Sequence, residues 1–197
     1  MFIGNVHPRE GLQLCTPQAA AGGEEYRRKA RRPLRRAHAT ILILYLSITL
    51  FTFILMEGIT WATHRYVMHG FLWYLHEDHH QPHGSLFEKN DAFFLIFAIP
   101  SWLCIMLGLQ NENYIAASIG FGIALYGFAY FLVHDVIIHQ RFKWFTRSSN
   151  VYVRTIRWAH KMHHKHMGKE HGESFGMLYV AKKYWEKVKA DKARKVF

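Results

Sequence analysis

The sequence predicts an all-α integral membrane protein with three to four transmembrane helices. Two observations lead to this fold class. Half of the 197 residues are hydrophobic, and they are gathered into long blocks that carry almost no charge. The charged residues lie between and beyond these blocks and give a formal net charge of +11, which suits a protein at an anionic membrane surface.

The chain divides by composition into an arm, a membrane domain and a tail. Residues 1–40 contain the basic run RRKARRPLRR and little apolar periodicity, so we expect a flexible basic arm or one that lies on a surface. Residues 41–181 hold every apolar block and form the predicted membrane domain. Residues 182–197 are again basic, and we expect a solvated tail or a helix that lies on lipid headgroups.

The first apolar block is ILILYLSITLFTFILMEGITWAT, residues 41–63. As a helix it would be roughly 34 Å long, enough to cross a bilayer. Glu57 lies near its far end. A carboxylate at that depth is costly unless it faces the protein interior or water, so we expect Glu57 to face inward.

The second and third blocks, residues 92–109 and 113–133, carry no charged residue. The polar run QNEN at 110–113 separates them, so we expect a helical hairpin, kinked at Pro100. Three buried helices of a soluble protein are the alternative, but uncharged apolar runs of about 18 residues or more are typical of spanning helices. Close approach of another helix is expected at Gly120, Gly122 and Gly127.

Ten of the fifteen histidines fall into four spaced boxes. The boxes are HRYVMH (His64, His69), HEDHH (His76, His79, His80), HDVIIH (His134, His139) and HKMHH (His160, His163, His164). An H-x4-H box followed by an H-x2-H-H box therefore occurs twice. Because two spans separate the first pair from the second, the chain crosses and returns, and all ten histidines end on one side of the membrane. A lone histidine such as His7 or His38 is an ordinary surface residue, but ten spaced histidines indicate a shared metal site.

The spacing within each box has a geometric meaning. Residues at i, i+3 and i+4 share a helix face, so His76, His79 and His80 can point together. The same holds for the second H-x2-H-H box. Residues five apart are about 140° apart on a regular helix. Either the helix is distorted at the H-x4-H boxes, or the two rings of each box reach different metal ions.

The number of histidines predicts two metal ions with roughly five ligands each, because one zinc ion takes about four. Imidazole suits Fe, Zn, Cu and Ni, so the ligands do not identify the metal. Zinc-protease, di-iron carboxylate, Rossmann and P-loop motifs are absent, and two cysteines provide no disulfide framework. The outer histidine nitrogens could bond to Asp78, Asp135, Glu170 or Glu173, although all four acids also suit ordinary hydrophilic positions.

Four segments resemble a known family: MEGITWATHRYVMHGFLWYLHEDHHQPH, FEKNDAFFLIFAIPSW, HDVIIHQRFKW and AHKMHHKHMGKEHGESFGMLYV. They resemble the bacterial-type β-carotene 3-hydroxylases of the fatty acid hydroxylase and sterol desaturase superfamily, over roughly residues 55–181. The resemblance implies a membrane non-haem di-iron mono-oxygenase that converts β-carotene through β-cryptoxanthin to zeaxanthin. It implies O2 as co-substrate and electrons from a ferredoxin-type carrier and its reductase. The ten clustered histidines would hold two iron ions, with no catalytic residue beyond these ligands.

Elementary chemistry agrees with this expectation. A C–H bond on an apolar polyene offers no acid, base or leaving group, so a metal-based oxidant is needed while the protein binds and orients the substrate. A carotenoid dissolves in the bilayer and can enter an adjacent site laterally. Phe71, Trp73 and Tyr74 lie between two boxes and would line that approach or anchor the protein at the interface.

The basic residues predict sidedness. Fifteen of the 25 Lys and Arg residues follow residue 133, so the histidine side should be cytoplasmic, in a bacterial inner membrane. With three spans, the arm and its eight basic residues would lie on the opposite side, which conflicts with that rule. The alternatives are a hydroxylase or desaturase of a sterol or fatty acid, or a metal carrier without catalysis. Nucleic-acid binding is disfavoured because the basic residues flank spans.

Overall fold

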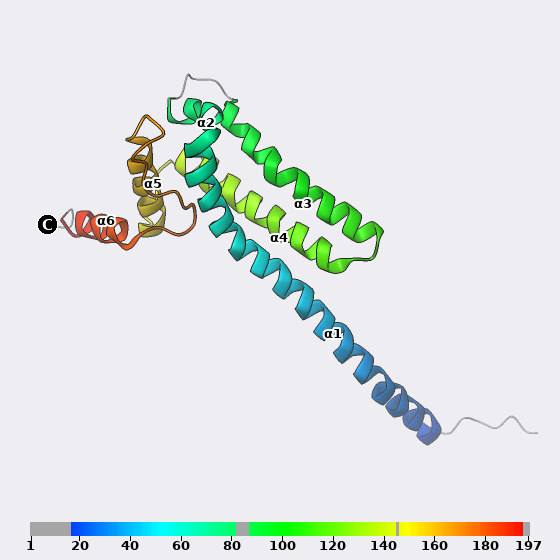
Figure 1. Ribbon diagram of the computed structural model, residues 1–197. Coiled ribbons are helices and arrows are strands. Elements are labelled where there is room, and N and C mark those ends of the chain that lie inside the picture. Colours follow the sequence, from blue (N-terminus) through cyan, green and yellow to red (C-terminus); the bar gives the residue numbers. More distant parts are fainter. Residues whose placement is uncertain (1–16, 82–86, 145, 195–197) are drawn as a thin grey trace, which may run out of the picture. The chain divides into compact units, whose positions relative to one another are not determined.

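The computed structural model describes residues 17–81, 87–144 and 146–194, and over these residues it is helical without strands (Figure 1). The predicted all-α fold is confirmed. Three ranges are long and apolar enough to cross a membrane: Arg31–Phe71, Lys89–Gln110 and Tyr114–Ile138. In chain order the helices are α1 (Pro17–Ala62), the π-helix η1 (Thr63–Phe71), α2 (Trp73–His80), the 3-10 helix η2 (Lys89–Asp91), α3 (Ala92–Gln110), α4 (Tyr114–Tyr130), the π-helix η3 (Phe131–Ile138), α5 (Val151–His164) and α6 (Lys182–Arg194).

The chain divides into two units within α1, between Leu44 and Tyr45. In the first unit, residues 17–44 are helical, where we expected a flexible basic arm or one that lies on a surface. Ala, Arg, Lys and Glu dominate the start of this segment and are strong helix formers, which accounts for the difference. Residues 1–16 of the arm lie outside the described residues, and the division into arm, domain and tail stays a prediction.

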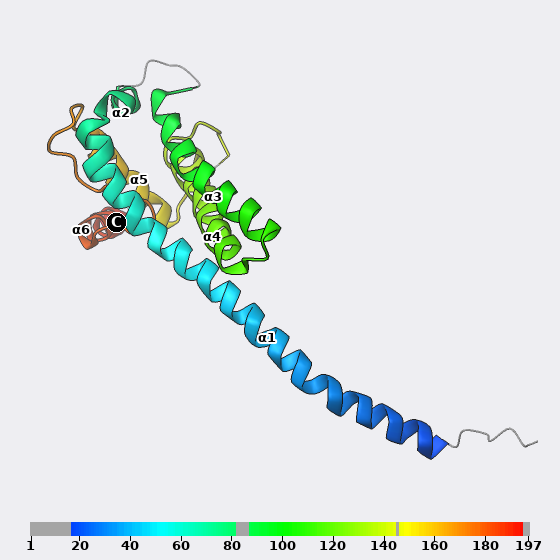
Figure 2. The same ribbon diagram turned by 45° about the vertical axis from the view of Figure 1, so that its right-hand side comes forward.

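In the second unit, α3 and α4 form the predicted hairpin and lie side by side (Figures 1 and 2). The backbone turns at Asn111 and Glu112, inside the polar run. A Cβ on Gly120 would lie 2.7 Å from the Ser101 carbonyl oxygen, and one on Gly122 would lie 2.5 Å from Cβ of Thr52. These two glycines therefore let α4 approach α3 and α1 closely, as predicted. Gly127 differs, because a Cβ there would meet nothing within 4 Å.

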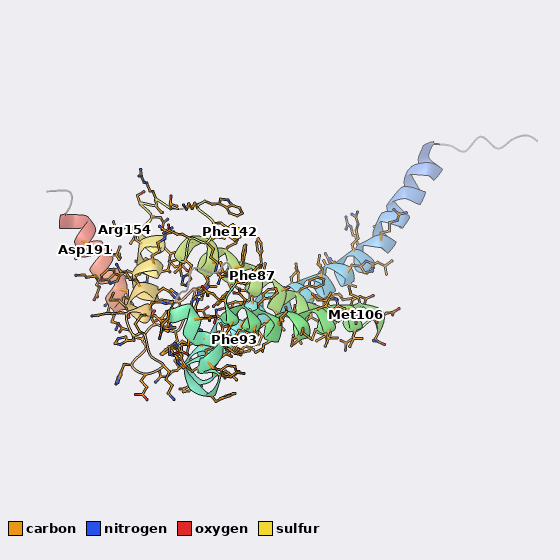
Figure 3. All side chains as sticks on the ribbon, turned by 90° about the horizontal axis from the view of Figure 1, so that it is seen from above. Phe87, Phe93, Met106, Phe142, Arg154 and Asp191 are labelled. Carbon is orange, nitrogen blue, oxygen red and sulfur yellow. The ribbon has the colours of Figure 1, made fainter. Side chains whose placement is uncertain are left out.

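The three spans expose most of their apolar side chains. Only 11%, 17% and 28% of their most apolar windows is buried within the protein. Figure 3 shows side chains projecting along the whole of α3, from Phe93 at one end to Met106 towards the other. Surfaces this apolar need a hydrocarbon surrounding, so the fold is that of a membrane protein.

Beyond the spans, α5 and α6 pack together around a small core of Ile156, Ala159, Val180 and Tyr184. Tyr184 and Val188 are 4% and 5% exposed and lie four residues apart on one face of α6. Residues 182–194 therefore form a packed helix, although a solvated tail was favoured from the sequence. The basic composition concealed this short apolar stripe.

Candidate metal centre

The four histidine boxes lie on four elements of the second unit. Box HRYVMH is on η1, HEDHH on α2, HDVIIH at the end of η3 and HKMHH on α5. Residues far apart in the chain bring their rings into contact here: the ring centroids of His64 and His163 are 4.5 Å apart. The prediction that all the boxes meet is confirmed.

Both H-x4-H boxes lie at π-helical turns. In η3 the His139 N–H donates to the His134 carbonyl over 2.8 Å, and in η1 the Leu72 N–H donates to the Val67 carbonyl over 3.0 Å. Such i→i+5 bonds define a π-helix, which brings residues five apart to the same side. From the sequence, the five-residue spacing had two possible explanations: a distorted helix, or rings that reach different metal ions. The structure shows the distortion.

Nine of the ten clustered histidines form two groups whose nitrogen atoms lie within 4.8 Å of one another. Group 1 contains His64, His69, His76, His80 and His163, and group 2 contains His79, His139, His160 and His164. His134 is buried beside group 2, with its ring centroid 4.4 Å from that of His139. Of the other five histidines, His7 and His83 lie outside the described residues, and His38, His166 and His171 belong to neither group.

Each H-x2-H-H box is divided between the two groups. The pair four residues apart enters one group, and the histidine between them enters the other. His79 and His80 are about 100° apart on α2, so they flank His76 and reach different groups. The expectation that all three point together is therefore met only for His76 and His80. Each H-x2-H-H box therefore contributes one histidine to the group formed by the other pair: α2 provides His79 to group 2, and α5 provides His163 to group 1.

The outer nitrogens of group 1 donate hydrogen bonds to neutral oxygens. Four acceptors are backbone carbonyls of the loop at residues 165–181, here called the C-terminal loop. The bonds run from Nδ1 of His64 to Phe175 (3.1 Å), of His69 to Lys169 (2.9 Å), of His80 to His166 (3.0 Å) and of His163 to Glu173 (2.9 Å). The fifth bond joins Nδ1 of His76 to the Asn90 amide oxygen over 2.7 Å.

These bonds fix the tautomer of each group 1 histidine, with the hydrogen on Nδ1, and leave the unprotonated Nε2 atoms close to one another. A carbonyl cannot donate, so Nδ1 carries the hydrogen and Nε2 of a neutral ring carries none. Nevertheless, Nε2 of His163 lies 3.3 Å from Nε2 of His69 and 3.1 Å from Nε2 of His80. Three acceptors cannot bond to one another, but nitrogens about 2.1 Å from one ion lie roughly 3.0 to 3.4 Å apart. The donor set of group 1 therefore fits a metal ion.

Group 2 offers the same donor chemistry. His79 donates from Nδ1 to the Glu88 carboxylate over 2.8 Å, while its Nε2 is buried and has no partner in the described part of the chain. Nε2 of His160 lies 2.8 Å from Nε2 of both His139 and His164. A cation between these nitrogens would satisfy the orphaned atom.

The clustered histidines outside the spans are held neutral, mainly by burial. Burial and neighbouring imidazoles lower the pKa to about 2 for His76 and His163, about 3 for His164 and about 4 for His80. The same causes place the pKa of His79 and His160 well below the usual range. Neutral imidazole is the form that ligates metals, so these rings are ready to bind without losing a proton.

Arg141 organises the acidic residues beside group 2. Its guanidinium lies 2.9 Å from Glu88, 3.1 Å from Asp91 and 3.5 Å from Asp135. Glu88 in turn accepts from His79, and Asp135 lies 3.3 Å from Nδ1 of His134. The Arg141 guanidinium thus holds the Glu88 and Asp135 carboxylates, which contact His79 and His134. No sequence pattern singled out Arg141, Glu88 or Asn90.

Glu57 anchors the C-terminal loop to the membrane helices. Its Oε1 accepts from the backbone N–H groups of Met177 (2.9 Å), Leu178 (2.9 Å) and Tyr179 (3.0 Å), and its Oε2 accepts from the Tyr126 hydroxyl (2.7 Å). Glu57 therefore faces the protein interior, as its depth required. The loop is held at both ends, by histidines of group 1 and by this carboxylate.

The three predicted substrate residues lie in different surroundings. The Trp73 ring centroid is 5.2 Å from those of both His69 and His80, so Trp73 packs on group 1. Phe71 and Tyr74 are 76% and 60% exposed. Their part in substrate binding stays a prediction, and Trp73 is the one placed beside the histidines.

The predicted acidic partners also differ in placement. Asp135 meets His134, whereas Asp78 accepts the backbone N–H that opens η2 (2.6 Å). Glu170 is exposed, and among the described residues it bonds to no clustered histidine. Glu173 contributes its backbone carbonyl to His163 instead of its side chain.

Comparison with known proteins identifies the family. The sequence profile described as fatty acid hydroxylase matches residues 49–183, more than half of the chain. The chain belongs to the fatty acid hydroxylase family. The matched range contains all four boxes, Glu57 and the C-terminal loop, and membership makes this protein a hydroxylating oxidoreductase.

Several relatives of this fatty acid hydroxylase carry the name beta-carotene hydroxylase. The one from Pseudescherichia vulneris is 42% identical over 137 residues, which cover 68% of this chain and 76% of the relative. The one from Pantoea ananas is 42% identical over 131 residues, 66% of this chain and 73% of the relative. A chloroplastic beta-carotene 3-hydroxylase of an Oncidium hybrid cultivar is 37% identical over 131 residues, 65% of this chain and 42% of the relative. No solved structure matches the chain.

Proposed function

We propose that this protein is a non-haem di-iron mono-oxygenase that hydroxylates C3 of the β-ionone rings of β-carotene, giving β-cryptoxanthin and then zeaxanthin. The proposal is carried by the two clusters of neutral histidines, group 1 and group 2, in a membrane protein whose relatives are named beta-carotene hydroxylases. The substrate is taken from those relatives, and the chemistry from the donor set.

The proposed ligands are the ten clustered histidines. Group 1 supplies five nitrogens and group 2 supplies four, with His134 as the tenth ligand at group 2. Iron is favoured over zinc because the reaction requires a redox-active ion, and imidazole suits both. The two ions, when bound, supply the activation of O2 that no side chain provides.

The reaction balances with two external electrons. At each ring a C3–H bond is replaced by C3–OH, one oxygen atom of O2 enters the product, and the other leaves as water after taking up two electrons and two protons. A ferredoxin-type carrier, reduced by its reductase, would deliver the electrons. The chain's own contribution is to bind the ring, orient the histidines and keep C3 as the reacting carbon.

We place the histidine end at the cytoplasmic face of a bacterial inner membrane. Fifteen of the 25 Lys and Arg residues follow residue 133 and support this side. A basic surface there also suits an acidic electron carrier. Residues 41–181 would then be the hydroxylase domain, preceded by a basic arm and followed by α6.

The test is coexpression in cells that accumulate β-carotene, with pigments separated by chromatography. We expect β-cryptoxanthin and zeaxanthin from the wild type and from His38→Ala, whose residue is exposed and remote in sequence, but not from His163→Ala. Purified wild type should contain about two irons per chain. Unchanged β-carotene from iron-loaded protein would contradict the proposal. Hydroxylated sterol or fatty acid, or bound zinc without O2 consumption, would support the alternatives.

A further inference from the structure

A cavity of about 820 Å³ runs beside the last turns of α1. The C-terminal loop and the start of α6 form its opposite wall. Its lining residues include Gly58, Trp61, His69, Phe175 and Tyr179. This volume lies within the usual range of small-molecule sites, so the cavity is large enough for part of an apolar ligand.

The cavity leads from the membrane to group 1. Gly58 and His69 both lie in the span Arg31–Phe71, with Gly58 further into it, and His69 belongs to group 1. The two residues are eleven positions apart, which corresponds to roughly 16 Å along a helix. A ligand that lies along this wall would therefore have one end at the histidines and the other near Gly58, further into the apolar span.

The two ends of the cavity differ in polarity. Near Gly58 the lining is mainly apolar: Trp61 is 37% and Tyr179 is 78% exposed, and a Cβ on Gly58 would meet nothing within 4 Å. Glu57 and Arg65 also line the cavity, but the Glu57 oxygens are bonded to backbone N–H groups and the Tyr126 hydroxyl, and the Arg65 guanidinium packs over the Trp61 ring. The far end carries Lys169, His171, Glu173 and Lys183. The Gly58 end lies further into an apolar span, so a lipid-soluble molecule can reach it from the hydrocarbon.

Phe175 forms the wall between the cavity and group 1. Its ring centroid lies 5.4 Å from that of His64, 5.2 Å from that of His69 and 5.3 Å from that of His163, in edge-to-face contacts. Its backbone carbonyl accepts from Nδ1 of His64. Phe175 is thus fixed to the histidines and lines the cavity, with the Arg65 guanidinium carbon 5.8 Å from its ring centroid.

We infer that the cavity receives the terminal ring of the carotenoid, which enters from the bilayer past Gly58 and stops against Phe175 and His69. The polyene then lies along α1 and its far end stays in the lipid. Phe175 acts as a positioning residue, because the depth at which the ring stops decides which carbon faces group 1. This inference rests on the proposed function and adds the route and the binding site of the substrate.

The test narrows the entrance without touching the histidines. In the series Gly58→Ala, Gly58→Leu and Gly58→Phe, hydroxylation and bound carotenoid should fall progressively, by at least ~10-fold for Phe, while the iron content stays unchanged. Gly127→Phe is the matched control, because Gly127 lies in a membrane helix, also has open space around its Cβ and lies outside the cavity. Bound β-carotene is measured on metal-free protein by its visible absorbance and induced circular dichroism.

The outcomes separate this inference from the proposed function. No hydroxylated carotenoid from the wild type would overturn the proposed function. An active wild type whose Gly58→Phe variant binds and hydroxylates equally well would overturn the cavity assignment alone, as would an equal loss in Gly127→Phe. As a second variant, Phe175→Leu should keep both irons and yield products hydroxylated at carbons other than C3. Products unchanged in position would contradict the role of Phe175.

Discussion

Group 1 and group 2 use the same two kinds of histidine box but orient their rings through different partners. In group 1, four outer nitrogens donate to backbone carbonyls of the C-terminal loop and one donates to the Asn90 amide. In group 2, His79 donates to the Glu88 carboxylate, and neighbouring His134 meets Asp135. Group 1 therefore depends on where a loop lies, and group 2 depends on a charge network centred on Arg141.

The difference has a chemical consequence. A carboxylate makes the imidazole it accepts from a stronger electron donor than a neutral carbonyl does. An ion held by group 2 would therefore be the more electron-rich of the two, whereas group 1 borders the cavity. Two sites with similar ligands can thus differ in potential and in access to substrate. Substitutions at either group test this asymmetry.

Replacing His163 or His79 should remove the metal ion from one group only. His163→Ala takes from group 1 the single ligand that α5 supplies, and His79→Ala takes from group 2 the single ligand that α2 supplies. We expect each variant to lose about one of two irons per chain and hydroxylation to fall more than ~100-fold, because outer partners alone cost 10–100-fold. Elemental analysis and product assays measure both. Loss of both irons in either variant would mean that the groups form one inseparable centre.

Neutralising Arg141 should weaken group 2 selectively. Arg141→Gln leaves the carboxylates of Glu88, Asp91 and Asp135 close together without their common cation. We expect a 10–100-fold loss of metal affinity at group 2 and little change at group 1. Chelator titration of metal-loaded protein resolves the two affinities. Lys143→Gln removes an exposed charge two residues away and should change neither. Equal weakening at both groups would contradict the division drawn here.

Part of this centre could be predicted from the sequence because its signals are local. The spacing of the boxes, the uncharged spans between them and the depth of Glu57 are all properties of residues near one another in the chain. They predicted that the boxes meet, and the five-residue spacing predicted either a distorted helix or divided metals. The structure shows π-helical turns, and it also divides the H-x2-H-H boxes, where we expected a shared face.

The outer partners could not be predicted because most of them are backbone atoms. The carbonyls of His166, Lys169, Glu173 and Phe175 carry no sequence signal, since every residue has a carbonyl group. The same limit applies to the N–H groups that Glu57 binds. The Glu173 carboxylate was one of the predicted partners of the histidines, but the backbone carbonyl of Glu173 is the group that accepts from His163. Such contacts depend on the path of the loop, which tertiary packing decides.

Releasing the loop should weaken group 1 by a smaller amount. Glu57→Ala removes the acceptor of three backbone N–H groups, so the Met177–Tyr179 segment should exchange its amide hydrogens faster. We expect metal affinity at group 1 to fall about 10-fold, with group 2 unchanged. Glu57→Gln keeps an acceptor oxygen and should show a smaller effect. Because Glu57 also lines the cavity, the decisive readouts are amide exchange and metal binding. Unchanged exchange would mean that the carboxylate does not hold the loop.

The smallest effect is expected from exchanging the acceptors themselves. Asn90→Asp gives His76 a carboxylate partner, so group 1 comes to resemble group 2, and Glu88→Gln does the reverse for His79. Both variants keep an acceptor oxygen at the ring, so both irons should remain and turnover should change only by about 3-fold, below the cost of losing an outer partner. Because a carboxylate strengthens the ring as a donor, Asn90→Asp should lower the reduction potential of the group 1 ion and Glu88→Gln should raise that of the group 2 ion. Potentiometric titration followed by Mössbauer spectroscopy distinguishes the two ions. Shifts of the same sign in both variants would show that the charge of the acceptor does not set the difference between the groups.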